Sequence, residues 1–207
     1  MCARYLTFEE WADTAFFELA PYAHTQTPTR QIRPADPAPV FIQSGEHISA
    51  EAMRWGFPMQ RSGVIFNARA ETLEEKPLFR DAYRLRRCIV PALGFYEWDS
   101  QTGQCYIFRA KGDGIVYMAG IYQEREGDAR FVIVTTGACA PVSQVHMRMP
   151  LVLQAGQAIR WLESIEQARV LRCGCTVPLS GEQAAVSSAH LRKHLPAMEM
   201  IGSCSRI

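Results

Sequence analysis

The sequence lacks the long apolar segments that insertion into a membrane requires. No apolar run reaches about 18 residues, which argues against a transmembrane helix. The first 20 residues, MCARYLTFEEWADTAFFELA, carry acids among their apolar positions. They have neither the basic start nor the continuous apolar stretch of a signal peptide. These absences predict a cytoplasmic protein with no membrane partner.

The sequence also has almost no net charge. Its 22 basic residues, most of them arginine, and its 21 acidic residues leave a formal charge of +1. A near-neutral chain is a poor general binder of nucleic acid, because affinity for phosphates comes from Lys and Arg side chains that release counterions. Any nucleic-acid site must therefore be a local patch, and arginines do cluster in YRLRR (83–87) and HMRM (146–149).

Regularly spaced cysteine pairs are missing too. The seven cysteines are odd in number and irregularly spaced, which argues against a disulfide framework and fits a reducing compartment. The Cys173-Gly-Cys175 stretch with His190 and His194 raises the question of a metal, but this spacing is too tight for a usual zinc site. We therefore predict no metal and no cofactor. Three further cysteines lie in strand-like runs and are most simply core residues: Cys88, Cys105 and Cys139.

Short strand-like runs joined by turns make up much of the chain. They fall at 40–43, 53–57, 63–66, 87–99, 104–110, 115–124, 130–138 and 146–153. The 207 residues suffice for one large domain with a full core, and no repeat, low-complexity tract or linker divides them. Strands joined by short turns, with helices at the periphery, favour an α+β class with a largely antiparallel sheet, in a single domain over 1–207.

Helical patterns are fewer. Thr7 and Glu10 form a capping-box pattern, which predicts a helix through about residue 20. The proline-rich stretch that follows predicts an extended wrapping loop. Residues 68–87 have helical content interrupted at Pro77, and 155–164 predict a helix. The tail predicts a further helical stretch around CTVPLS.

Four stretches place polar groups within apolar strand patterns, where burial is costly unless the groups are paired or used: MCAR, FNARAET, GFYEWD and VHMRMPLVL. Glu97 either points to water or, between two aromatic residues, has a raised pKa suited to proton transfer. Asn67 and Arg69 share one strand face, either as a surface strand or as an amide beside an anion-binding fork. His146 is either a structural group or a general acid–base catalyst.

Cys2 is an unusual choice for packing, because a chain terminus is generally frayed and solvated. Once the initiator methionine is removed, Cys2 carries a thiol and a free α-amine on adjacent carbons. An aldehyde condenses with such an amine to an imine, and the thiol then closes a five-membered thiazolidine. Only an N-terminal cysteine can make this product.

Taken in order, these stretches resemble the SRAP family, the SOS-response-associated proteins that process abasic sites in single-stranded DNA. The resemblance is carried by M-C-A-R, W-G-F, N-A-R-A-E-T, R-C-I-V-P-A-L-G-F-Y-E-W and H-M-R-M-P-L-V-L, and is clearest over 1–163. It implies that the sheet is barrel-like. It implies these active-site residues: Cys2 as covalent nucleophile, with Asn67, Glu97 and His146. It implies these DNA contacts: Arg4, Arg69 and Arg148 on phosphates, with Trp55 and Trp98 stacking near the lesion.

The resemblance further implies a monomer whose partner is single-stranded DNA containing abasic sites. The product would be a thiazolidine crosslink, with an abasic-site lyase side reaction. Glu97 would shuttle protons, His146 would assist opening of the sugar ring, and Asn67 would orient the Cys2 amine or a substrate hydroxyl. Two alternatives stay open. One is an N-terminal-nucleophile peptidase or amidohydrolase with Asn67 as oxyanion donor and His146 as base. The other is a non-catalytic module that binds single-stranded DNA.

Overall fold

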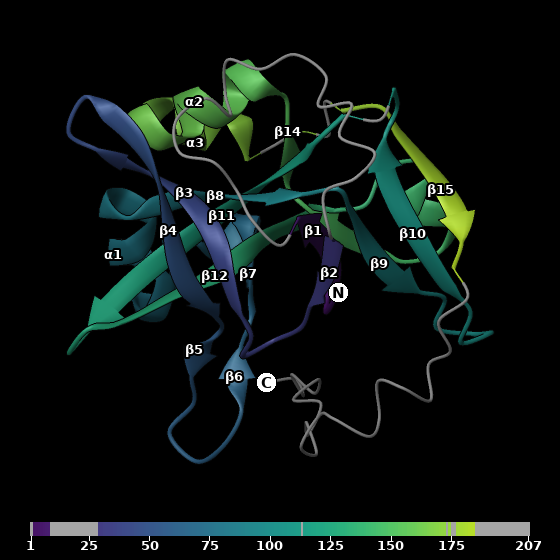
Figure 1. Ribbon diagram of the computed structural model, residues 1–207, viewed down its shortest axis with the longest axis horizontal. Coiled ribbons are helices and arrows are strands. Elements are labelled where there is room, and N and C mark those ends of the chain that lie inside the picture. Colours follow the sequence, from purple (N-terminus) through teal and green to yellow (C-terminus); the bar gives the residue numbers. More distant parts are fainter. Residues whose placement is uncertain (1, 9–28, 113, 173, 175–176, 185–207) are drawn as a thin grey trace, which may run out of the picture.

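The fold is given by a computed structural model that describes residues 2–8, 29–112, 114–172, 174 and 177–184. Five strands close into a barrel, because their hydrogen-bonded pairings return to the starting strand (Figure 1). In ring order they are β12 (Asp128–Gly137), β4 (His47–Trp55), β3 (Pro37–Ser44), β8 (Arg87–Ala92) and β11 (Val116–Arg125). The β12–β4 pairing is parallel and the other pairings around the ring are antiparallel. The expected α+β class with a barrel-like, largely antiparallel sheet is confirmed.

A second sheet stands beside the barrel, on the right in Figure 1. Its strands follow the order β15 (Leu179–Gln183), β10 (Cys105–Ala110), β9 (Gly94–Trp98), β1 (Tyr5–Phe8) and β2 (Thr29–Ile32). All pairings in this sheet are antiparallel. Because β1 lies between β2 and β9, the amino-terminal segment is an interior strand of this sheet.

Short strands extend the barrel wall. On β12 lie β7 (Asn67–Arg69) and β13 (Arg148–Pro150), and on β11 lies β14 (Val152–Leu153). Thr135 of β12 pairs with Arg69 on one side and with Pro150 on the other. The strands β5 (Phe57–Pro58) and β6 (Val64–Ile65) pair with each other.

The barrel strands are buried on both faces. Along β8, β11 and β12, alternate side chains enter two hydrophobic clusters. Val90, Met118 and Phe131 belong to the cluster that contains Cys2 and Tyr5. Their sequence neighbours belong to a second cluster beneath the helices: Ile89, Ala119 and Val132. This double burial explains why these segments read as near-continuous apolar runs.

Helices cover the outer face of the barrel. They are η1 (Ala70–Thr72, 3₁₀), α1 (Pro77–Leu85), α2 (Ala155–Glu163) and α3 (Ile165–Leu171). The short 3₁₀ helix η2 (Val142–Gln144) instead packs Val142 into the cluster that contains Cys2. Pro77 is the first residue of α1, a position where its missing N–H costs no helical hydrogen bond. The interruption expected at Pro77 and the helix expected at 155–164 are therefore confirmed. No helix in the described part of the chain is long and apolar enough to span a bilayer.

Two helix predictions need correction. Thr7 is not a helix cap, because it belongs to β1, where it pairs with Arg30 and its Oγ1 donates to the carbonyl of Pro91 at 3.2 Å. Residues 9–20 of that predicted helix lie outside the described residues. In the tail, the segment predicted to be helical around CTVPLS instead enters a strand, β15, because it completes the edge of β10. In the described part of the extended loop predicted before β3, Thr29–Ile32 form the strand β2.

The cysteines predicted to be core residues differ from one another. Cys88 and Cys105 are buried and free, as expected. Cys139 is only half-buried and is disulfide-bonded, with its Sγ 3.6 Å from the Sδ of Met149. The core assignment is therefore confirmed for Cys88 and Cys105, whereas Cys139 is partly buried and packs against the edge of the core.

Arg87 ties two helix ends to the barrel. Its guanidinium donates to the carbonyls of Tyr83 (2.9 Å) and Arg84 (2.7 Å) at the end of α1. It also donates to the carbonyls of Trp161 (2.6 Å) and Leu162 (3.0 Å) at the end of α2. Since the last carbonyls of a helix have no partner within the helix, one side chain satisfies four of them.

We predict that Arg87→Met lowers the free energy of unfolding by about 2 to 3 kcal/mol, because these charge-assisted hydrogen bonds are lost. Urea denaturation measures the effect. The control is Arg84→Met, an exposed arginine of the same helix end, which should change stability by less than about 0.5 kcal/mol. Equal effects of the two substitutions would contradict the role of Arg87.

Candidate active site at the amino terminus

Cys2 lies in the core, three residues before the first residue of β1. It is fully buried in the cluster between the barrel and the second sheet, together with Trp55 and Phe66. Its Sγ lies 3.7 Å from the carbonyl oxygen of Arg4. Burial raises the pKa of the Cys2 thiol well above its usual range, and the charge of Glu97 raises it further. The thiol is therefore protonated at neutral pH.

Asn67 connects the barrel to Cys2. It opens β7, which pairs in parallel with β12 in the register Asn67↔Ile133. The Asn67 Nδ2 donates a hydrogen bond to the carbonyl of Cys2 at 2.8 Å. The Asn67 Oδ1 is buried and accepts no hydrogen bond from the described residues. A buried acceptor without a partner is costly, so this oxygen is suited to a donor that a substrate or a free amine supplies.

Glu97 lies in β9 and is only 1% exposed. The strands β1 and β9 are antiparallel with Tyr5 opposite Phe95, and this register, continued, places Glu97 opposite Ala3. Burial raises the pKa of Glu97 to about 7. Its carboxyl group therefore exchanges protons near neutral pH, as a general acid–base catalyst must.

His146 lies on the loop between η2 and β13. Its Nδ1 is 2.9 Å from the backbone nitrogen of Arg148 and 3.0 Å from the Arg148 carbonyl oxygen. These contacts fix the ring by one nitrogen and leave Nε2 on the opposite edge of the imidazole. Burial lowers the pKa of His146, so the ring is neutral at pH 7.

His146 also lines a cleft of ≈ 310 Å³ between the β9–β10 turn and the η2 loop. The other lining residues are Asp99, Ser100, Gln101, Ser143, Gln144, Val145 and Met147. The lining contains amides, hydroxyls, an imidazole and the Asp99 carboxylate but no lysine or arginine. The cleft is therefore better suited to neutral polar groups than to phosphates.

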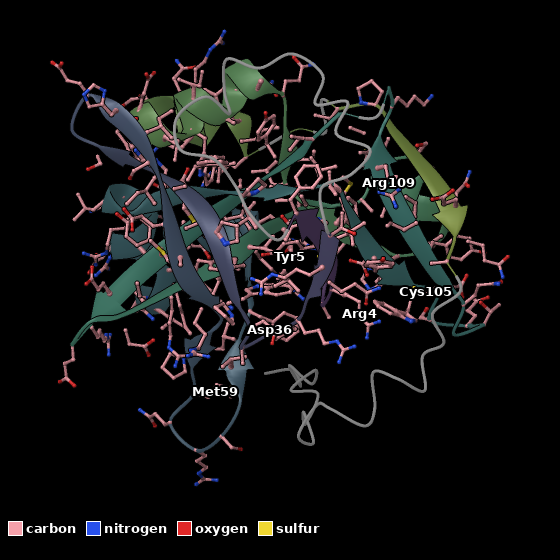
Figure 2. All side chains as sticks on the ribbon, in the orientation of Figure 1. Arg4, Tyr5, Asp36, Met59, Cys105 and Arg109 are labelled. Atoms are coloured by element: carbon pink, nitrogen blue, oxygen red, sulfur yellow. The ribbon has the colours of Figure 1, made fainter. Side chains whose placement is uncertain are left out.

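The arginines predicted to hold phosphates differ in availability. The Arg69 side chain is exposed and makes no hydrogen bond or ion pair with the described residues. Arg4 is buried, its guanidinium carbon lies 5.3 Å from the centre of the Trp98 ring, and its Nε has no hydrogen-bond partner in the described chain. Burial lowers the pKa of Arg4, and the nearby charge of Arg33 adds to this effect. In the view of Figure 2, Arg4 lies between Tyr5 and Cys105.

Arg148 differs from the other two arginines, because its fork is already occupied. Its Nη1 and Nη2 contact the two carboxylate oxygens of Glu71 at 2.5 and 2.9 Å. Its Nη2 also donates to the carbonyl of Thr135 at 2.7 Å. The prediction that Arg148 holds a phosphate does not fit this arrangement, since a bidentate carboxylate uses the same donors.

The two tryptophans predicted to stack on DNA lie in different environments. Trp55 is fully buried, its Nε1 donates to the carbonyl of Phe66 at 2.8 Å, and its ring packs on Tyr5 at a centroid distance of 5.2 Å. It has no exposed face for a base, so its predicted stacking role is wrong and Trp55 is a core residue. Trp98 is half-buried at the end of β9, and Arg4 covers one face of its ring.

The site therefore combines segments that are distant in the sequence. Asn67 contacts Cys2 directly, and Glu97 acts electrostatically on the Cys2 thiol. His146 lies on the loop that precedes β13. The strand β13 pairs with one side of β12, and β7 pairs with the other side. Sequence reasoning missed Glu71, although the N-A-R-A-E-T motif that revealed Asn67 and Arg69 contains it.

No group of three or more His, Cys, Asp or Glu side chains in the described ranges could hold a metal ion. The stretch that raised the metal question lies almost entirely outside those ranges: Cys173, Cys175, His190 and His194.

Fold and site together define a class: a barrel-like α+β protein whose second residue, a cysteine, is held by an amide beside a buried carboxyl group. Residues 1–189 match the family described as SOS response associated peptidase (SRAP). The chain belongs to this family.

Curated relatives agree with this assignment, and a solved structure has the same fold. The chain is 31% identical over 180 residues to Abasic site processing protein YoqW of Bacillus subtilis, covering 78% of this chain and 80% of the relative. It is 28% identical to Abasic site processing protein YedK of Escherichia coli, covering 70% of each. A solved structure from Bordetella bronchiseptica has the same fold, with a TM-score of 0.71 at 20% identity, covering 89% of this chain and 100% of that one.

The pKa of Glu97 predicts a pH-dependent contribution to stability. The pKa rises from 4.5 to about 7 on burial, so the fold favours the protonated carboxyl. This contribution is fully present below pH 4.5 and is lost as the pH rises through 7. At about 1.4 kcal/mol per pKa unit, the loss is on the order of 3 kcal/mol.

Glu97→Gln removes this titration. Relative to the wild type, the variant should therefore gain on the order of 3 kcal/mol of stability between pH 5 and pH 8, measured by urea denaturation. Glu75→Gln, at an exposed carboxyl group, is the control and should show no such gain. A stability difference between Glu97→Gln and wild type that stays constant with pH would contradict the assignment.

Proposed function

We propose that this protein processes abasic sites in single-stranded DNA, and that it does so by forming a thiazolidine crosslink through Cys2 after removal of the initiator methionine. One observation carries the proposal: Asn67 holds the Cys2 carbonyl next to a buried carboxyl group whose pKa is about 7. The relatives named abasic site processing proteins support the substrate class. Because this chain alone supplies every residue of the site, we propose that it acts as a monomer.

The first chemical step uses the amine of Cys2. An opened abasic deoxyribose presents an aldehyde, and the amine nitrogen adds to its carbon to form a carbinolamine. Loss of the hydroxyl as water then gives an imine. Glu97 supplies the proton that leaves with the water and accepts a proton from the amine, which requires a pKa near the working pH.

The second step uses the thiol. The Cys2 sulfur adds to the imine carbon, a carbon–sulfur bond forms, and the imine nitrogen becomes the ring amine. The thiol proton passes to that nitrogen through Glu97, so no oxidant or further reactant is needed. The raised pKa of the thiol fits this order, because a protonated thiol is a poor first nucleophile.

Two further residues prepare the substrate. As a neutral ring whose Nδ1 donates to the Arg148 carbonyl, His146 accepts the C1′ hydroxyl proton on Nε2 and passes it to the sugar ring oxygen as the ring opens. Asn67 orients the Cys2 amine through its carbonyl contact and its free Oδ1. An imine that loses a C2′ proton before the sulfur adds would expel the 3′ phosphate by β-elimination, which gives a lyase side reaction.

The alternative of a cysteine peptidase is less well supported. Such an enzyme needs a thiolate, and therefore a thiol whose pKa is lowered by nearby positive charge. Here burial and Glu97 both raise the pKa of Cys2. Amine-first chemistry is compatible with this environment, whereas thiolate-first attack on an amide is not.

Few of the DNA contacts predicted from the sequence are available in the structure. Arg69 is exposed and Arg4 lies without a carboxylate partner over Trp98. We propose that the exposed Arg69 holds a phosphate, that the buried Arg4 adds positive charge behind Trp98, and that the uncovered face of Trp98 stacks on a base, which grips a single strand without reading its sequence.

The crosslink is tested with single-stranded DNA that bears one abasic aldehyde. Wild type should give an adduct that survives denaturation, and its intact mass should equal protein without the initiator methionine plus DNA minus one water. Cys2→Ala should give no such adduct. A variant extended at the amino terminus keeps the Cys2 thiol but blocks the amine, and it should also fail to form the adduct.

Each other outcome has a defined meaning. A stable adduct in the extended variant would show that the amine is not required, and the thiazolidine would be excluded. Cys2-dependent peptide cleavage without an adduct would favour the peptidase. Binding of intact DNA that is unaffected by Cys2→Ala, without an adduct, would favour the non-catalytic module.

The role of Arg69 is tested by the salt dependence of binding. The probe is single-stranded DNA with a tetrahydrofuran abasic analogue, which has no aldehyde and binds without covalent capture. Loss of one phosphate contact should reduce the slope of log K against log salt by about 0.7 in Arg69→Gln. Arg84→Gln, an exposed arginine on α1, should leave the slope unchanged, and an unchanged slope in Arg69→Gln would exclude the contact.

A further inference from the structure

An ion pair crosses the end of β12 next to the site. Glu71 comes from η1, directly after β7, and Arg148 is the first residue of β13. These two strands flank β12 on opposite sides at Thr135. The Arg148 fork binds both carboxylate oxygens of Glu71 and the Thr135 carbonyl between them. The pair therefore joins three neighbouring strands through side chains.

The same arginine anchors His146. The His146 Nδ1 contacts the backbone nitrogen and carbonyl of Arg148 at 2.9 and 3.0 Å. The position of the imidazole therefore depends on where the backbone of Arg148 lies. That backbone is held in two ways. Arg148 pairs with Gly137 between β13 and β12, and the Arg148 guanidinium binds Glu71. The fork acts independently of the strand ladder.

We infer that Glu71 is a positioning residue, which acts through Arg148 to hold His146 in place for its role in the reaction. The inference rests on the proposed function. The Arg148 side chain is only 18% exposed, so its charge needs a partner. Hydrogen bonding to Arg148 lowers the pKa of Glu71, which keeps the carboxylate ionised at neutral pH.

A competing explanation is that Glu71 occupies Arg148 only until a phosphate replaces it. Two observations favour positioning. Arg148 donates to the Thr135 carbonyl and to Glu71 at once, so its guanidinium is held from two directions. Arg69, two residues before Glu71, is exposed and makes no such contacts, so it is the better phosphate ligand on this side of the site.

The test separates binding from the chemical step. Glu71→Gln should slow single-turnover adduct formation at saturating abasic DNA by about 10- to 100-fold, because small displacements of a catalytic group have effects of this size. The dissociation constant for the tetrahydrofuran analogue should stay within about 2-fold of wild type, since Glu71 is not a DNA ligand. Circular dichroism and thermal unfolding check that the variant is folded.

The matched control is Glu74→Gln. Glu74 lies three residues after Glu71. It forms ion pairs with Arg169 of α3 (2.8 Å) and with Arg172 just after α3 (3.1 Å), and these pairs lie away from His146. It should form the adduct at the wild-type rate. If wild type and this control form no Cys2-dependent adduct, the proposed function fails. If both form it and Glu71→Gln is equally fast, the inference alone fails.

A double-mutant cycle tests whether Glu71 acts through Arg148. Arg148→Met should slow the reaction by a similar factor, and Glu71→Gln added to it should cause no further loss. Multiplicative losses would show that Glu71 acts independently of Arg148 and would overturn the inference. Tighter binding of the analogue by Glu71→Gln, with a steeper salt dependence, would identify Glu71 as a competitor of phosphate and would also overturn it.

Discussion

The pairing of β1 between β2 and β9 is the constraint on which the rest of the site depends. A chain terminus generally frays, yet here backbone hydrogen bonds on both sides and the packing of Tyr5 on Trp55 hold the amino-terminal strand in the core. The second residue is therefore delivered to a defined place, where Asn67 can bind its carbonyl. The same packing explains why Trp55 serves the core and is not available to DNA.

Burial has a common effect on the ionisable groups of the site. It raises the pKa of Cys2 and of Glu97, and it lowers the pKa of His146. Each shift favours the uncharged form, because desolvation penalises charge. Near neutral pH the Cys2 thiol is therefore protonated and His146 is uncharged, and Glu97, with a pKa of about 7, is the group of the three that readily exchanges protons. Condensation of an aldehyde with an amine needs such proton exchange at several steps, whereas a thiolate nucleophile would need the opposite environment.

The arginines near the site explain how a near-neutral chain could bind DNA. Arg148 is neutralised by Glu71, and Arg87 is used by helix carbonyls. Arg4 and Arg69 are left without carboxylate partners among the described residues. The exposed cation of Arg69 beside a buried nucleophile is the local feature that the proposed binding of DNA needs in a chain with a formal charge of +1.

The sequence by itself determined the barrel strands, since apolar runs such as those of β8 and β11 have no other stable arrangement than burial on both faces. It also determined the candidate chemistry, because a second-position cysteine and the motif residues Asn67 and Glu97 can be recognised locally. Tertiary structure alone decided that Thr7 lies in a strand, that Trp55 is buried and that Arg148 binds Glu71. These outcomes depend on partners far away in the chain, 77 residues for Arg148 and Glu71 and 65 for Asn67 and Cys2. Local patterns of hydrophobicity and charge carry no information about which distant residues will meet.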